Sequence, residues 1–105
     1  MKKNGINKYM DYKVKLSNIP LNEDNRVEIE KHLFDLKDIS STYFETIAEI
    51  CKIQENSYTC TLALKRDNHI LSTEKIEEKS LISVLEKAKE SLTEKALIEF
   101  VQMSA

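Results

Sequence analysis

The sequence has very little glycine: Gly5 is its only glycine in 105 residues. A phosphate-binding loop or a dinucleotide-binding turn needs several glycines, because the backbone must approach the phosphates closely and adopt positive φ angles. We therefore expect no nucleotide-dependent catalysis and no cofactor of that kind.

Histidine is equally scarce, with two residues in the chain. His32 and His69 fall on different predicted elements, and no cluster of Cys, His and Asp has the spacing of metal ligands. We expect His32 at a helix boundary and His69 in a hairpin turn, and we expect no metal site.

Two cysteines, Cys51 and Cys60, are too few for a disulfide scaffold. If residues 47–64 form a hairpin that turns at residues 55–56, Cys51 lies directly opposite Cys60, close enough for a bridge under oxidation. In a reducing cytosol, two free and buried thiols are favoured.

The sequence also lacks an apolar run long enough for a secretory signal or a membrane span. We expect a cytoplasmic protein with no membrane partner. A chain of 105 residues with 41% hydrophobic composition suffices for one small domain. The predicted organisation is a flexible basic leader at residues 1–10, one domain at residues 11–100 and a short tail at residues 101–105.

The formal net charge of -2 argues against a protein that coats nucleic acid by bulk attraction. Charge is nevertheless sorted along the chain. Residues 1–16 hold five lysines and one aspartate, whereas residues 21–38 hold six acidic and three basic residues. A local basic patch can therefore coexist with an acidic total.

Residues 22–36 predict a capped amphipathic helix. Asn22 can accept a hydrogen bond from the first turn, and Glu23 and Asp24 place negative charge at the positive end of the helix dipole. Apolar residues recur at the spacing of a single buried stripe, namely Ile29, Leu33 and Leu36.

Alternation of apolar and polar residues predicts four strands, at residues 12–18, 43–53, 58–65 and 69–75. Pro20 ends the first strand because proline cannot continue the ladder of hydrogen bonds. A long second helix is predicted by the apolar stripe Leu81, Val84, Leu85, Ala88, Leu92, Ala96 and Phe100.

The order β-α-β-β-β-α predicts an α+β domain, a four-stranded antiparallel meander with both helices on one face. The predicted floor under the helices is Ile47, Cys51, Ile53, Tyr58, Cys60, Leu62, Leu64 and Leu71. The opposite face is expected to carry Lys52, Thr59, Thr61, Lys65 and Ser72. Such a face suits docking on a large polar partner, and an ordinary solvated face explains it equally well.

Glu77 and Glu78 are predicted at the start of the second helix, where carboxylates interact favourably with the helix dipole. Neighbouring helix positions do not face a common point, so this pair is not expected to perform acid–base catalysis. We expect no enzymatic activity and no small-molecule substrate.

Four groups of residues follow a known pattern: Asn22, Arg26, Ile29-Glu30-Lys31 and Leu33-Phe34-Asp35-Leu36. They resemble the capping Thr, the Arg, the Ile-Glu-Lys and the Leu-x-x-Leu of the short ribosome hibernation-promoting factors and ribosome-associated inhibitors, also called the sigma-54 modulation protein family. The Tyr-Phe pair of that family is present as Tyr43-Phe44, displaced by a few residues. The resemblance covers residues 13–95 with few identities.

Two segments depart from the family pattern. Residues 78–85 replace an acidic residue followed by Asp-Met-Tyr-Ala-Ala-Ile-Asp, and only the apolar rhythm of Leu81 and Val84 is kept. Asp67-Asn68 replaces the paired glycines of the last hairpin. The chain thus resembles a divergent member of the family.

The resemblance implies a fold like that of double-stranded-RNA-binding domains and a non-catalytic function. Such a protein docks on 16S rRNA in the mRNA and tRNA channel of the small ribosomal subunit and inhibits translation in stress or stationary phase. Lysines and arginines would meet rRNA phosphates and recognise shape. Long family members append a domain that joins two ribosomes; the chain ends at Ala105, and we expect it to act as the short form. The implied rRNA-binding residues are Arg26, Lys31, Lys65 and Arg66, with Lys79, Lys87 and Lys89 on the second helix.

The alternative is a protein–protein interaction domain of the same fold that does not bind ribosomes. The net acidity and the altered second-helix segment favour this alternative. An unpaired sheet edge would allow such a domain to form a homodimer.

Overall fold

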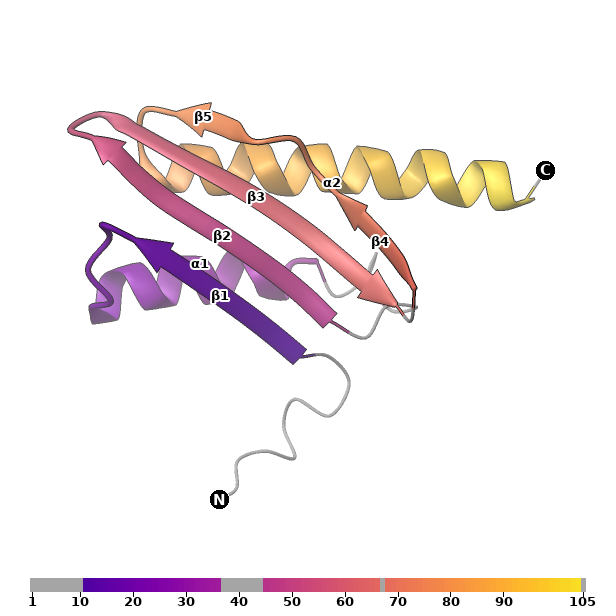
Figure 1. Cartoon of the computed structure of the whole chain (residues 1–105), viewed down its shortest axis with the longest axis horizontal. Coiled ribbons are helices and arrows are strands. Elements are labelled where there is room, and N and C mark those ends of the chain that lie inside the picture. Colours follow the sequence, from indigo (N-terminus) through magenta and orange to yellow (C-terminus); the bar gives the residue numbers. More distant parts are fainter. Residues whose placement is uncertain (1–10, 37–44, 67, 105) are drawn as a thin grey trace, which may run out of the picture.

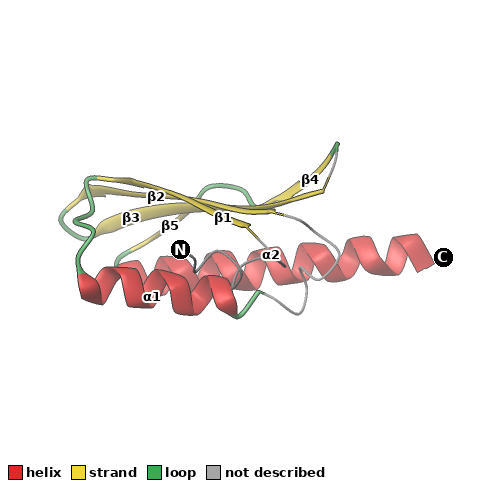
Figure 2. Ribbon diagram, turned by 90° about the horizontal axis from the view of Figure 1, so that it is seen from below, coloured by secondary structure: helices red, strands yellow, loops and turns green. Residues whose placement is uncertain are grey.

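The computed structural model describes residues 11–36, 45–66 and 68–104. The strands form one sheet, and both helices lie on the same face of it (Figure 2). The predicted α+β class and the placement of both helices are thus confirmed. Figure 1 shows the elements in order as β1 (Asp11–Ser17), α1 (Glu23–Phe34), β2 (Glu45–Gln54), β3 (Ser57–Arg66), β4 (His69–Ser72), β5 (Ile76–Glu78) and α2 (Leu81–Ser104).

The sheet is mixed, with the strand order β1-β2-β3-β4, and β5 also pairs with β3. β1 runs parallel to β2, so that Lys13 is the partner of Ile47 and Lys15 the partner of Glu49. The prediction of an all-antiparallel meander is therefore wrong. The reason lies in the connection: α1 returns the chain to the starting end of β1, and such a strand–helix–strand crossover joins parallel strands.

A β-bulge near the β2–β3 turn changes which face of β2 is buried. Gln54 pairs with Ser57, but after an irregularity between Lys52 and Gln54 the partner of Cys60 is Ile50. A one-residue shift of register moves every side chain of a strand to the other face. The prediction that Cys51 lies opposite Cys60 is therefore wrong.

Because of this shift, the predicted set of helix-facing residues on β2 is also wrong. On β2 the buried residues are Thr46, Ala48 and Ile50, and Ile53 is 55% exposed. Lys52 is the partner of Tyr58 and lies over its ring, so it does not share the open face either. On β3 the prediction holds, and the helix-facing core residues there are Cys60, Leu62 and Leu64.

The fourth predicted strand is interrupted. Thr73 accepts a hydrogen bond from the Leu62 N–H through its hydroxyl (3.1 Å) and donates its own N–H to the Leu62 carbonyl (2.9 Å). Pairing with β3 resumes where Ile76 meets Cys60, so residues 76–78 form β5. Glu77 and Glu78 lie in this strand, and their prediction at the start of the second helix is wrong.

Both helices begin at side-chain caps. The Asn22 side chain accepts from the Asn25 N–H at 2.9 Å, as predicted, and the Ser80 hydroxyl accepts from the Ser83 N–H at 3.0 Å. α1 is preceded by Asn18, which has a φ of 62°. Asparagine tolerates this left-handed conformation, and it allows a sharp turn out of β1.

The core lies between the sheet and the helices. Leu33 of α1 and Leu36, just beyond its end, join Val84, Leu85 and Leu92 of α2 in one cluster beneath the sheet, and all of these are nearly inaccessible to solvent. Burial of each such leucine contributes about 1.5–3 kcal/mol. The α1 stripe is thus confirmed.

Some predictions fall at the limits of the structure. The basic leader at residues 1–10 and the Tyr43-Phe44 pair lie outside the described residues, as does Asp67. Residues 101–104, expected as a short tail, continue α2. No helix among the described residues is long and apolar enough to span a membrane.

Candidate nucleic-acid interface

The two predicted cations of α1 lie on its surface among carboxylates. Arg26 is bound by Glu23 and Glu30, each at 3.3 Å, and these neighbours raise the pKa of its guanidinium. Lys31 lies 3.9 Å from Glu28. Pairs of this kind, three or four residues apart on a helix, hold the cations close to neutralising charge.

On α2, Lys87 and Lys89 point in different directions. Lys89 donates to the Asp35 carboxylate at 2.9 Å and so faces α1. Residues two apart are separated by about 200° around a helix axis, so Lys87 faces away from α1. The hydrogen bond from Lys89, followed by its charge, lowers the pKa of Asp35. Lys89 therefore joins the two helices, whereas Lys87 is exposed to a partner.

The remaining predicted cations lie off the helices. Lys79 precedes α2 instead of lying on it, so its predicted placement is wrong. Lys65 and Arg66 end β3 and project to opposite faces of the sheet: Lys65 is paired with Ile70, and Arg66 with His69, whose ring contacts Glu99 of α2. The seven predicted residues are therefore not gathered on one face.

The helical layer as a whole is acidic. α1 and α2 contain eight Asp and Glu residues against five Lys and Arg residues. This excess repels a phosphate backbone that approaches the layer broadly, and it favours contact through a few projecting cations. Lys79 and Lys87 are the predicted residues that fit this requirement best, since both are exposed and near the start of α2.

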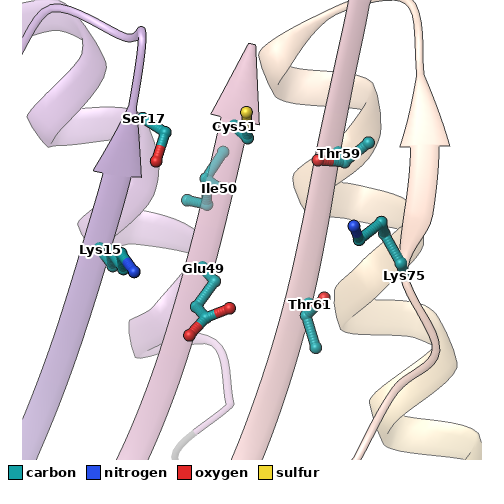
Figure 3. A pocket seen from close by; sticks show the side chains of 8 residues that line it. All are labelled: Lys15, Ser17, Glu49, Ile50, Cys51, Thr59, Thr61 and Lys75. Carbon is teal, nitrogen blue, oxygen red and sulfur yellow. The ribbon is translucent and has the colours of Figure 1, made fainter. Parts of the chain in front are cut away.

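Neither of the described helices covers the opposite face of the sheet (Figure 2). A shallow depression of about 120 Å³ lies across β1, β2 and β3 on this face. Figure 3 shows Lys15 on one side of it and Lys75 on the other, with Glu49 and Thr61 between them. Its full lining is Lys15, Ser17, Glu49, Ile50, Cys51, Thr59, Thr61 and Lys75.

Of these lining residues, the sequence pattern predicts only Thr59 and Thr61 on the open face. Lys15 could have been found from its alternation with Val14 and Leu16, which are apolar. Lys75 could not, because it lies in the interruption between β4 and β5, where the two-residue period of a strand no longer applies.

The histidines follow the sequence prediction in their positions. His32 lies buried in the last turn of α1, and its Nδ1 is 2.8 Å from the Glu28 carbonyl oxygen, to which it donates. His69 begins β4 directly after the hairpin turn. Within the described residues, no group of three or more His, Cys, Asp or Glu side chains could hold a metal ion.

The element order, the mixed sheet and the two helices on one face define an α+β fold that occurs in solved structures. The fold is similar to the N-terminal domain of Protein Y from Thermus thermophilus, with a TM-score of 0.63, 14% sequence identity, and coverage of 85% of this chain and 99% of that domain. No protein-family model matches the chain, and no curated protein matches it in sequence. At this identity, the likeness establishes the fold.

Proposed function

We propose that the protein is a non-catalytic, cytoplasmic ribosome-binding protein that docks on 16S rRNA in the mRNA and tRNA channel of the small subunit and inhibits translation in stress or stationary phase. The observation that supports this most strongly is the fold likeness to nearly the whole N-terminal domain of Protein Y, which belongs to the ribosome-associated protein family. The resemblance of the α1 residues to the hibernation-promoting factors supports it independently, because it rests on side chains and not on backbone shape.

The proposed rRNA contacts are phosphate contacts, which orient a protein without reading sequence. We place Lys79 and Lys87 at the centre of the contact between the helical layer and rRNA, since no ion pair of either is found among the described residues. Arg26 and Lys31 are secondary, because each would exchange a carboxylate partner for a phosphate. The outer contacts are assigned to Lys65 and Arg66.

The test is co-sedimentation of the purified protein with small ribosomal subunits over a range of salt concentrations. Binding is expected at physiological salt and should weaken as salt rises, because phosphate contacts release counterions. Reversing the charge of Arg26, Lys31, Lys79 and Lys87 to Glu together should abolish binding.

For the single variant Lys87→Glu, a matched control is Lys95→Glu, which makes the same charge change two turns further along the same helix and should leave binding largely intact. Circular dichroism of each variant separates loss of binding from loss of folding. Absence of binding by the unmodified protein, at low as well as physiological salt, would overturn the proposal.

The acidic helical layer supports a second candidate function, that of a protein–protein interaction domain. Val27 and Phe34 lie seven residues apart on α1 and are 47% and 57% exposed. Together with the excess of carboxylates, they suit a basic protein partner better than RNA.

Homodimer formation through an unpaired sheet edge is the variant of this function that the sequence suggested, and β1 lies at one end of the strand order. A two-fold antiparallel pairing centred on Val14 would set Lys13 of one copy opposite Lys15 of the other, and like charges in that position destabilise a sheet. Lysines on an edge strand commonly prevent such pairing. Light scattering over a range of concentrations tests this variant, and a dimer mass that depends on concentration would support it.

A further inference from the structure

The open face of the sheet has a polar depression, on the side opposite to the helices that are proposed to contact rRNA. Figure 2 shows that neither helix covers this face. Figure 3 shows side chains from β1, β2, β3 and the β4–β5 connection converging on the depression. Thr59 is buried at its floor, and Ser17, Cys51 and Thr61 are half-buried.

Lys15 and Lys75 flank the depression, and neither has a carboxylate partner in the part of the chain that the structure describes. Lys13 lies two residues before Lys15, on the same face of β1. It is bound to Glu45 at 2.7 Å, and its hydrogen bond lowers the pKa of the Glu45 carboxyl. By contrast, no ion pair of Lys15 or Lys75 is found among the described residues. Strands are about 4.8 Å apart, so the two lysines begin about 14 Å apart and can reach toward one another across the sheet. They suit anionic groups spaced along an extended ligand.

Between the lysines lie groups that suit hydroxyl donors. An ionised Glu49 carboxylate accepts hydrogen bonds but cannot donate them, while the hydroxyls of Ser17 and Thr61 can donate or accept. A ligand that is anionic throughout would be repelled by Glu49. A ligand that alternates anions with hydroxyl groups would satisfy the lysines and the carboxylate together.

We propose that this depression binds a single-stranded segment of RNA backbone, with phosphates at Lys15 and Lys75 and a ribose 2′-hydroxyl donating to Glu49. The 2′-hydroxyl is the group that distinguishes RNA from DNA, so Glu49 would supply selectivity that the lysines lack. The inference rests on the proposed function and extends it: a thin two-layer protein inside an rRNA channel would contact RNA on its sheet face as well as on its helices.

The test uses oligouridylate and oligodeoxyuridylate of equal length, with binding followed by fluorescence anisotropy over a range of salt concentrations. We expect preferential binding of the RNA strand. Two-dimensional NMR of labelled protein should show the amides of Lys15, Glu49, Thr61 and Lys75 shifting on titration. Replacing Lys15 and Lys75 with Ala should make the slope of log K against log salt shallower by about 1.4, because each single-strand phosphate contact contributes about 0.7.

Two variants separate a specific site from general electrostatics. The control double variant Lys52→Ala and Lys95→Ala removes equal charge elsewhere and should keep the wild-type slope. Glu49→Ala should lower the ratio of RNA to DNA affinity; a carboxylate that merely repels phosphate would raise both affinities and leave the ratio unchanged, which would overturn the proposal.

The outcomes distinguish this inference from the proposed function. Amide shifts confined to the helices, or equal losses in the two double variants, would overturn the sheet site while leaving ribosome binding standing. Oligonucleotide binding at the depression by a protein that does not co-sediment with small subunits would support the site and overturn the proposed function.

Discussion

Cys51 and Cys60 differ in exposure, which governs how readily a thiol reacts. Cys60 is buried in the core, and its burial raises the pKa of its thiol to about 12. Cys51 is partly exposed on the open face of the sheet. The two residues project from opposite faces, because Ile50 and not Cys51 is the partner of Cys60.

We therefore predict that iodoacetamide modifies Cys51 in the folded protein and Cys60 only after unfolding, since the thiolate is the reacting species. Peptide mass spectrometry with and without denaturant measures both sites, and Cys51→Ser provides the control. Mild oxidation should give no internal disulfide. Recovery of a peptide pair linked through both cysteines from folded protein would contradict this assignment of faces.

The Lys89–Asp35 pair predicts a pH dependence of stability. The pKa of Asp35 is lower in the folded protein than in the unfolded chain, so the folded state binds its proton less tightly. The stabilisation is fully present above the unfolded pKa, about 3.9, and is lost as pH falls through the folded pKa.

The measurement compares urea unfolding of the wild type with Asp35→Asn from neutral pH down to well below the unfolded pKa of about 3.9. The wild type should be the more stable at neutral pH, and the difference should shrink in acid. The effect is expected to be small, because both side chains are at least partly exposed and water screens the pair. A difference that is constant with pH would show that the pair does not contribute through charge.

At the level of elements, the start of α1 makes a prediction about stability. The Asn22 side chain caps the Asn25 N–H, so Asn22→Ala should lower the free energy of unfolding by about 1 kcal/mol. Asn22→Ser keeps an oxygen acceptor and should remain close to the wild type. Chemical denaturation of the three proteins measures the effect, and equal losses in both variants would contradict the cap.

The two lysines of α2 should respond differently to charge reversal. Lys89→Glu places a carboxylate beside Asp35 and should lower thermal stability, while Lys87→Glu should leave stability unchanged and weaken small-subunit binding. Thermal unfolding and co-sedimentation of both variants give the comparison. Full binding by a folded Lys87→Glu protein would remove Lys87 from the interface.

The α1 and β3 elements were predictable because their patterns are local. Asn22 and the Ile29–Leu33 spacing determine α1, and regular alternation determines the buried face of β3. The bulge at Ile53 and the interruption at Thr73 were not predictable, because each depends on how one strand pairs with another. Both irregularities changed the candidate site: one moved Cys51 to the open face, and the other placed Lys75 beside the depression.

For the whole molecule, the sequence shows which residues are cationic but does not show where the fold places them. Helical periodicity alone separates Lys87 from Lys89, but the contact of Lys89 with Asp35 depends on the packing of α2 against α1. The resulting molecule has an acidic helical layer with a few projecting lysines and an open sheet face on which Lys15 and Lys75 have no ion pair among the described residues. The proposed RNA contacts on both faces would suit a protein enclosed in a channel.

The most direct test of the central claim is a competition experiment on purified small ribosomal subunits. Subunits are loaded with mRNA and tRNA, and binding of labelled protein is measured against empty subunits at the same salt concentration. If the protein docks in the channel, mRNA and tRNA should exclude it, and excess protein should displace them. Equal binding to loaded and empty subunits would contradict docking in the channel, as would the absence of binding to either.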